Sequence, residues 1–118
     1  MLRPEDAYER YERAWKEPER AAALLAECLA EDGIYADDEV PEGVVGPAAL
    51  AALIAATHAE LTGFRVWATS APRMLAGRLA ITWAQEGGDP PAPQAGTDVI
   101  EFGTDGRITR ITNVLATS

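Results

Sequence analysis

Residues Gly96 to Thr112, with the sequence GTDVIEFGTDGRITRIT, decide the fold of this chain. Two runs rich in valine, isoleucine and threonine flank the pair Asp105-Gly106, and apolar side chains alternate with polar ones in both runs. An Asp-Gly pair tolerates the positive φ angles of a tight reversal, and β-branched residues favour strands. The stretch therefore predicts a β-hairpin built from residues 96–102 and 107–112.

Three amphipathic helices are predicted before this hairpin. The first covers residues 4–16, the second runs from Glu19 to about Glu31 and ends at Gly33, and the third runs from Pro47 to about Leu61. Their apolar stripes are Tyr8, Tyr11 and Trp15; Leu24, Leu25, Cys28 and Leu29; and Leu50, Leu53, Ile54, Thr57 and Leu61. A short strand, residues 34–36, is predicted between the second and third helices.

Two more strands are predicted between the third helix and the hairpin, over residues 64–70 and 74–86. In the second of them Leu79, Ile81 and Trp83 alternate on one face, and residues 87–93 contain three prolines that favour an extended loop. Helices collected on one side of an antiparallel meander make an α+β fold, and a cavity can remain between the two layers.

The composition indicates one domain, residues 1–118, in which 47% hydrophobic residues supply a single core. The net charge of −9 is uneven, because residues 1–42 hold 13 acids and 5 bases. An acidic surface repels phosphate groups, so we expect no nucleic-acid partner and no binding to anionic membranes. The sequence has one cysteine and lacks both a run of ~20 apolar residues and a signal-peptide core, so we expect a cytoplasmic protein.

Four segments together resemble the NTF2-like superfamily, in particular its SnoaL-like and ketosteroid-isomerase-like branch. They are Ala14-Trp15, the stretch LAEDGIYAD at residues 29–37, VGPAAL at residues 45–50, and residues 96–108. The resemblance covers nearly the whole chain. It implies a cone-shaped α+β barrel, with three N-terminal helices packed on a curved, mainly antiparallel sheet, a deep apolar pocket between the layers, and a homodimer formed through the sheet.

Asp37 is the first candidate for catalysis. It follows the apolar run Ile34-Tyr35-Ala36 into the predicted cavity mouth, where partial loss of solvent would raise the pKa of a carboxylate above its usual ~3.9. The resemblance implies the same place for a proton-shuttling aspartate. The alternative is a solvated residue of an acidic loop, because Asp38, Glu39 and Glu42 follow directly.

Asp98 is the second candidate. Strand alternation puts it on one face with Ile100 and Phe102, and a lone carboxylate in an apolar setting must be paired or protonated. The resemblance to cyclases of the superfamily implies an acid–base aspartate on a late strand. A structural role, in which Asp98 bonds to the backbone or to an arginine, carries equal weight.

The resemblance to the isomerases also shows a departure. Their tyrosine on the first helix corresponds to Tyr11 if two residues are missing near Pro18, which makes Tyr11 a third catalytic candidate. Their second acid corresponds to Ala95, so the group of donors that would stabilise an oxyanion is incomplete or differently built. Steroid isomerase activity is therefore not expected.

Trp15, Tyr35 and Trp83 are candidate ligand-binding residues, because aromatic rings combine a large apolar area with a polar group. His58, the single histidine, is a further candidate beside the apolar face of the third helix, although a half-exposed surface position is the commoner case. One histidine and one cysteine give little support for a metal site, and we expect no cofactor.

Two functions remain open at this point. The first is a pocket protein that catalyses isomerisation, cyclisation or dehydration of an apolar, oxygen-bearing small molecule without a cofactor, with Asp37 as base and Asp98 as a second acid. The second is a non-catalytic ligand-binding or dimerisation module, which would leave the pKa values of both aspartates at their ordinary levels.

Overall fold

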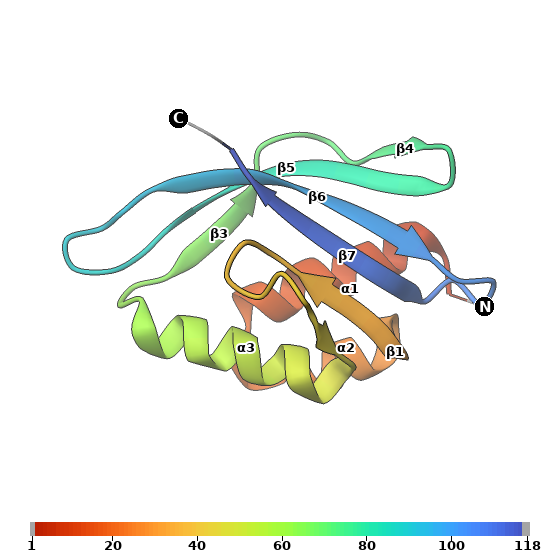
Figure 1. Ribbon diagram of the computed structural model, residues 1–118, viewed down its shortest axis with the longest axis horizontal. Helices are drawn as coiled ribbons and strands as arrows, with labels where there is room; N and C mark the ends of the chain where they lie inside the picture. The colour runs from red at the N-terminus through yellow and green to blue at the C-terminus, as the bar shows by residue number, and fades with distance from the viewer. Residues whose placement is uncertain (1, 117–118) are drawn as a thin grey trace.

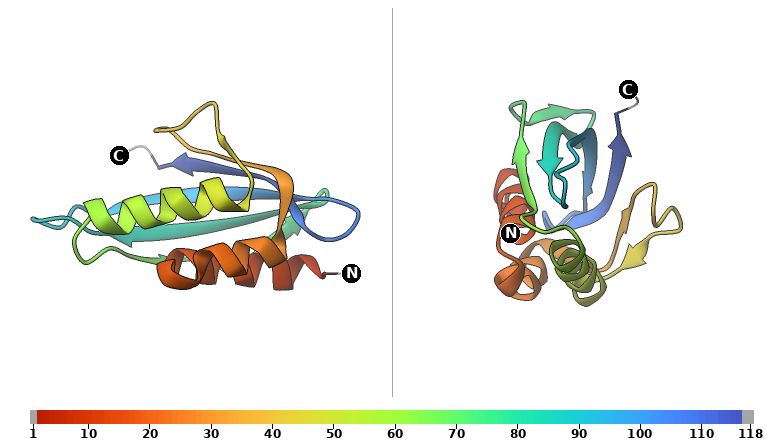
Figure 2. Two further views of the ribbon diagram at one scale, coloured as in Figure 1. Left: turned by 90° about the horizontal axis from the view of Figure 1, so that it is seen from below. Right: turned by 90° about the vertical axis from the view of Figure 1, so that its left-hand side faces the viewer.

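The fold consists of a layer of three helices packed against one curved sheet (Figure 1). The computed structural model describes residues 2–116. All three helices lie on the same side of the sheet, and the sheet curves over them (Figure 2). This arrangement confirms the predicted α+β class of NTF2-like fold.

Helix α1, Pro4–Lys16, follows the expected bounds closely. Proline stands at its first position, acidic residues occupy its first turn and basic residues its last turn, and all three features suit the helix dipole. A 3-10 turn, Pro18–Arg20, leads into helix α2, Ala21–Cys28. Helix α3, Pro47–Glu60, again begins at a proline, as predicted.

Helix α2 ends earlier than its sequence pattern predicts. Strand β1, Leu29–Ala36, begins directly after Cys28, because Leu29 pairs with Ile108 of the C-terminal strand. The predicted helix end at Gly33 is therefore wrong. Gly33 lies in β1 next to an irregularity in the pairing, and a Cβ atom there would come within 2.6 Å of the Leu29 side chain. A Cβ atom would also lie 2.9 Å from the carbonyl oxygen of Ala30, so the local irregularity within β1, rather than helix capping, requires this glycine.

The sheet has the strand order β2-β1-β7-β6-β5-β3, with β4 paired to β5. Strands β1 and β7 run parallel and the other neighbours antiparallel. The remaining strands are β2 Val44–Val45, β3 Arg65–Ala68, β4 Arg73–Leu75, β5 Arg78–Glu86, β6 Gln94–Phe102 and β7 Ile108–Leu115. In the described part of the chain β2 and β3 form the two edges and do not pair, so the curved sheet stays open and is not a closed barrel.

The segment predicted as one strand, residues 74–86, is two strands. A turn at Ala76 and Gly77, whose φ angles are 54° and 77°, reverses the chain so that β4 folds back on β5. The alternation expected in β5 is confirmed, since Leu79, Ile81 and Trp83 are all buried. The loop of residues 87–93 links β5 to β6, as its prolines predict.

The C-terminal hairpin predicted from residues 96–112 is present. Ile100 pairs with Ile111 and Asp98 with Asn113, and the turn is held by Asp105, whose side chain accepts a hydrogen bond from the Arg107 amide at 2.9 Å. One face of this hairpin closes the core against the helices. The largest fully buried side chains are Cys28, Leu25, Leu29, Leu50, Ile54, Leu79, Ile100, Ile108 and Ile111.

Candidate functional site

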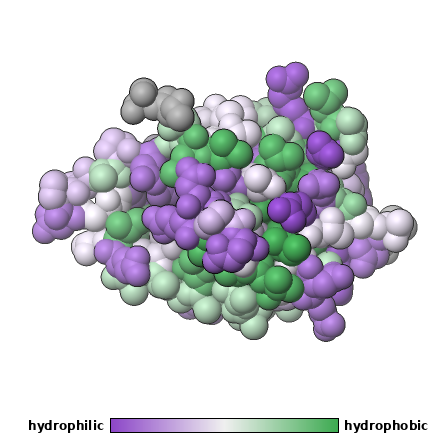
Figure 3. All heavy atoms as spheres, in the orientation of Figure 1, coloured by the Kyte–Doolittle hydropathy of each residue, from purple (hydrophilic) through white to green (hydrophobic). Residues whose placement is uncertain are grey.

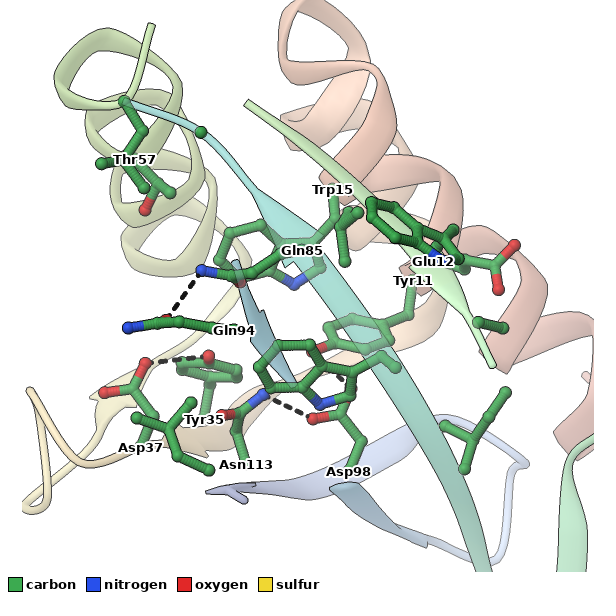
Figure 4. A pocket seen from close by; sticks show the side chains of 18 of the residues that line it. Tyr11, Glu12, Trp15, Tyr35, Asp37, Thr57, Gln85, Gln94, Asp98 and Asn113 are labelled. Carbon is green, nitrogen blue, oxygen red and sulfur yellow. Dashed lines mark hydrogen bonds between the residues drawn. The ribbon is translucent and has the colours of Figure 1, made fainter. Parts of the chain in front are cut away.

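A pocket of about 240 Å³ opens between the helices and the sheet. Its walls come from α1, α3, the end of β1 with the loop that follows it, and the inner face of strands β3, β5, β6 and β7. Figure 4 shows the labelled side chains of α1, β1, β5, β6 and β7 converging on this space. The cavity predicted between the two layers is therefore present.

Asp98 lies at the buried end of the pocket. It is 7% exposed and stands on β6 with its side chain on the core face, next to Ile81 of β5 and opposite Asn113 of β7. Asn113 Nδ2 donates a hydrogen bond to Asp98 Oδ1 at 2.8 Å, and the Tyr11 hydroxyl donates a longer one to Asp98 Oδ2 at 3.4 Å (Figure 4). Strand alternation predicted this apolar setting correctly.

The surroundings of Asp98 make its proton unusually hard to remove. Burial raises the pKa of Asp98 from 3.8 to about 6, and the charge of Asp37 adds to the rise. Hydrogen bonding by Asn113 and Tyr11 and the nearby indole of Trp83 oppose the rise, because all three stabilise the charged form. The result is a buried carboxyl group that exchanges its proton close to neutral pH.

Two buried phenols donate hydrogen bonds to the carboxyl groups of the site, Tyr11 to Asp98 and Tyr35 to Asp37. Burial, followed by the charge of Asp98, raises the pKa of Tyr11 well above 10. Burial, followed by the charge of Asp37, raises the pKa of Tyr35 in the same direction. Both hydroxyl groups consequently keep their protons throughout the physiological range.

Asp37 lies in the pocket wall, but donors from the protein occupy both of its carboxylate oxygens. Oδ2 accepts a hydrogen bond from the Tyr35 hydroxyl at 2.9 Å, and Oδ1 accepts two backbone N–H bonds at 2.9 Å, from Glu39 and Val40. The side chain therefore holds the turn that follows β1 while remaining next to the pocket. It is half-buried, whereas Asp98 is buried.

The predicted aromatic residues Trp15, Tyr35 and Trp83 all line the pocket. The rings of Trp15 and Tyr35 are 6.0 Å apart at 49°, within the range of aromatic contact. Trp83 is 7% exposed, and its Nε1 has no hydrogen-bond partner among the described residues. The pocket thus combines aromatic walls with one buried indole N–H that makes no hydrogen bond of good geometry among the described residues, although it lies near enough to Asp98 to stabilise its charged form.

His58 and Cys28 lie away from the pocket surface. His58 Nε2 donates a hydrogen bond to the backbone oxygen of Trp15 at 2.8 Å, and its ring meets Phe64 edge to face at 4.8 Å, so it ties α3 to α1. Cys28 is fully buried, and burial raises the pKa of its thiol to about 12. A thiol of this kind is a poor nucleophile at neutral pH.

The sequence predictions do not name several polar residues of the pocket, among them Asn113, Gln85 and Gln94. Gln85 Nε2 donates a hydrogen bond to Gln94 Oε1 at 3.1 Å across β5 and β6 (Figure 4). The position of Asn113 could have been predicted, because pairing the two strands about the Asp-Gly turn places it opposite Asp98. The positions of the two glutamines could not, because they flank a long loop and the sequence does not fix how the strands on either side of that loop pair.

No group of three or more histidine, cysteine, aspartate or glutamate side chains within residues 2–116 is arranged to hold a metal ion. None of the helices in the same part of the chain has the length and apolar character needed to span a bilayer. The side chains that line the pocket include carboxyl groups, phenols, amides and indoles.

The fold and the pocket define an NTF2-like α+β protein, and sequence comparison narrows the class. The profile of the SnoaL-like domain matches residues 8–111, so the chain belongs to the SnoaL-like domain family. The resemblance noted from four short segments is confirmed by this match. No curated protein matches the sequence closely enough to count as a relative.

Solved structures share the fold across nearly the whole chain. A candidate isomerase of the SnoaL-like family from Agrobacterium tumefaciens is 24% identical, with a TM-score of 0.80 over 94% of this chain and 95% of the other. An NTF2-like protein of unknown function from Exiguobacterium is 18% identical, with a TM-score of 0.78 over 95% and 99%. An LEH-like epoxide hydrolase from M. tuberculosis is 18% identical, with a TM-score of 0.72 over 93% and 76%.

Proposed function

We propose that this protein is a cofactor-independent enzyme that moves a proton on an apolar, oxygen-bearing small molecule, with Asp98 as the general acid and base. Isomerisation, cyclisation and dehydration all fall within this reaction class. The observation that carries the proposal is the position of Asp98, a buried carboxyl group with a pKa of about 6 at the inner end of a pocket.

The pKa of Asp98 suits proton transfer in both directions. A general acid or base works best when its pKa lies near the working pH, because both protonation states are then accessible. Near pH 7 Asp98 is mostly ionised and can accept a proton from a carbon acid, and the protonated form can return the proton to a neighbouring atom. Hydrogen bonds from Asn113 and Tyr11 fix the orientation of the carboxyl group during this exchange.

Charge that develops on a substrate oxygen needs a donor in the same space. The Tyr11 hydroxyl makes a long hydrogen bond to Asp98, and Trp83 Nε1 makes no hydrogen bond of good geometry within the described part of the chain. Either group can therefore donate to an oxygen that becomes negative as Asp98 removes a proton. In the isomerases that the sequence resembles, a second acid stabilises the oxyanion, and this chain has Ala95 at the corresponding position. Tyr11 and Trp83 would supply the missing hydrogen-bond donor.

Asp37 is proposed as the second carboxyl group of the site. Three hydrogen-bond donors already engage it, so we assign it mainly to holding the wall of the pocket and to raising the pKa of Asp98 through its charge. As a base it would have to give up part of this network. Asp98 therefore takes the leading role that the sequence pattern gave to Asp37.

A purely binding module is the alternative, and the site does not favour it. A sealed or filled space between helices and sheet would suit such a module, whereas this chain keeps an open pocket that reaches a buried acid with a raised pKa. Neighbouring structures of the fold include an LEH-like epoxide hydrolase, and a candidate isomerase belongs to the same SnoaL-like family. Both support an enzyme more than a scaffold.

The test uses 2-tetralone, an apolar ketone whose α-protons exchange with solvent when a base removes them. Wild-type protein in D2O should accelerate this exchange, followed by proton NMR, and Asp98→Asn should lose about 10²-fold or more of the acceleration. Asp37→Asn measures the contribution of the second carboxyl group. Asp32→Asn, which removes a charge at an exposed position away from the pocket, should exchange at the wild-type rate. Equal rates for wild type and Asp98→Asn would refute the proposal.

We also propose a homodimer that forms through the outer face of the sheet. Leu75 and Val114 are 73% and 51% exposed, and their strand positions put them on the face away from the helices. Apolar side chains gathered on one sheet face are typical of an interface. Light scattering at micromolar concentration should give twice the chain mass of 12.6 kDa. Thr97→Arg, which adds charge to this face, should give the monomer, and a monomeric wild type would exclude the dimer.

A further inference from the structure

We infer that the ligand of this pocket carries a protonated amine on an apolar body, together with an oxygen that accepts a hydrogen bond. The inference rests on the proposed function, because it assumes that the pocket is the ligand site. It goes further in naming the charge of the ligand and the two ends of the pocket that recognise it.

The charged side chains described in the pocket wall are all acidic. Six carboxyl groups line it, and among the described lining residues there is no lysine, arginine or histidine; the six are Glu12, Asp37, Asp38, Glu39, Glu60 and Asp98. Within residues 2–116, Glu12 alone of the six has a cation at ion-pair distance, Lys16 at 3.3 Å. The other five carboxyl groups are present without a compensating base in the described part of the chain, so the pocket attracts a cation and repels an anion.

The outer part of the pocket is where the cation would bind. Asp38, Glu39 and Glu60 are exposed and so stand at its opening, two of them on the loop between β1 and β2 and the third at the end of α3. Hydrophilic side chains gather over that loop at the centre of Figure 3. An ammonium group placed there keeps part of its hydration, so the cost of desolvating it stays small while the carboxylates attract it.

The inner end of the pocket presents a hydrogen-bond donor that a ligand acceptor could satisfy. Trp83 Nε1 is buried without a hydrogen-bond partner among residues 2–116, and the indole lies close enough to Asp98 to lower its pKa. A buried N–H group without a partner is costly and rare in a native structure. A carbonyl or hydroxyl oxygen of a ligand would satisfy it at the point where Asp98 exchanges its proton. This donor lies at the inner end of the pocket, apart from the exposed carboxylates at its opening, and it also points to a ligand acceptor.

Aromatic rings connect the two ends. Trp15 and Tyr35 contact each other in the wall, and both can cover an apolar ring or attract a nearby cation through their faces. A volume of about 240 Å³ suits a ligand of one or two fused rings. The lining carboxylates do not meet in a group of three that could hold a metal, which favours an organic cation over a metal ion.

The binding test compares three compounds that share one carbon skeleton: 2-aminotetralin, 2-tetralol and tetralin-2-carboxylate. Titration calorimetry at pH 7 in low salt should show the amine binding about tenfold more tightly than the alcohol, with the carboxylate weakest of the three. The preference for the amine should shrink in 0.5 M NaCl, because salt screens the exposed carboxylates. Equal binding of amine and alcohol, or no binding of either, would overturn the inference.

Variants separate the two ends of the site. The triple variant Asp38→Asn, Glu39→Gln and Glu60→Gln should lose the preference for the amine and keep the affinity for the alcohol. A matched triple, Glu19→Gln, Glu31→Gln and Asp32→Asn, changes the net charge equally at exposed positions outside the pocket and should keep the preference. An amine preference that survives in the first triple, or disappears equally in both, would refute a local carboxylate site.

Trp83→Phe tests the acceptor at the inner end. This variant removes the N–H but keeps an aromatic ring. It should therefore weaken 2-tetralol, whose hydroxyl oxygen can accept from the indole, and leave 2-aminotetralin, which has no acceptor, unchanged. Unaltered affinity for 2-tetralol would contradict the acceptor. Asp98, Tyr11 and Trp83 are intact in both triple variants, so 2-tetralone exchange by these two proteins reports failure of the proposed proton transfer separately from failure of the amine preference.

Discussion

Replacing Asp98 with asparagine should stabilise this protein at neutral pH, although it should also remove the proposed activity. The pKa of Asp98 is about 6 in the folded chain against an ordinary value of 3.8. A difference of about two pH units corresponds to about 3 kcal/mol of folding free energy. Because the residue is 7% exposed, solvent screening removes little of this. Asparagine can still accept from Asn113 and can donate to Tyr11, so the packing remains filled.

The direction of the pH dependence follows from the raised pKa. The folded chain binds the Asp98 proton more tightly than the unfolded chain, so the contribution of this residue to stability is complete below pH 3.8 and is lost as the pH rises through 6. Wild type should therefore lose about 3 kcal/mol from this group between pH 3 and pH 7.5. The Asp98→Asn variant has no such ionisation, so its advantage over wild type should grow over the same interval.

Urea denaturation at several pH values between 3 and 8, followed by far-UV circular dichroism, measures this difference. At pH 7.5 the variant should be more stable by an amount approaching 3 kcal/mol relative to its difference at pH 3, or by roughly 10 °C in melting temperature. Asp32→Asn, an equal change of charge on the surface, is the control. A stability difference between wild type and Asp98→Asn that stays constant with pH would refute both the raised pKa and the catalytic role built on it.

Three further predictions concern neighbours of this site. Asn113→Ala removes a donor that stabilises the charged form, so the pKa of Asp98 should rise above about 6, measured by carbon NMR of the carboxyl group. Tyr35→Phe removes the hydrogen bond to Asp37 and should cost about 1 kcal/mol in thermal unfolding, and no loss would argue that the bond is unimportant. Gly96→Ala would put a Cβ atom 2.5 Å from an indole carbon across the strand pair and should cost about 1–3 kcal/mol in urea; wild-type stability would show that the strands yield freely.

Local sequence pattern was sufficient to predict the elements whose ends are marked by a proline or by an Asp-Gly turn. Proline at the start of α1 and α3, and the Asp-Gly pair between β6 and β7, fixed those elements correctly. The C-terminal end of α2 could not be predicted from local sequence pattern. Its last turn is displaced by the pairing of Leu29 with Ile108, a contact between residues far apart in the sequence. Tertiary pairing overrides helix propensity at such a position.

In the candidate site, too, sequence pattern predicted some features, whereas others depend on tertiary contacts. Alternation along β6 placed Asp98 on the core face, and the three aromatic residues named from the sequence line the pocket. The relative importance of Asp37 and Asp98 depended on hydrogen bonds that no pattern reveals, namely the two backbone donors that occupy Asp37. Helical spacing likewise put His58 near the apolar face of α3 but could not show that its ring would bond to the backbone of α1.

The parallel pairing of β1 with β7 has a consequence for how the site is assembled. The two strands lie at opposite ends of the sequence, so their contact closes a loop that contains α3 and most of the sheet. Tyr11 of α1 likewise reaches Asp98 of β6 across 87 residues. Contacts of such long sequence separation form slowly, because the chain must lose conformational entropy before these contacts contribute any stabilising free energy. A nascent chain emerging from the ribosome would therefore have no working pocket until its final strand was released, and a fragment that ends before β7 should be inert.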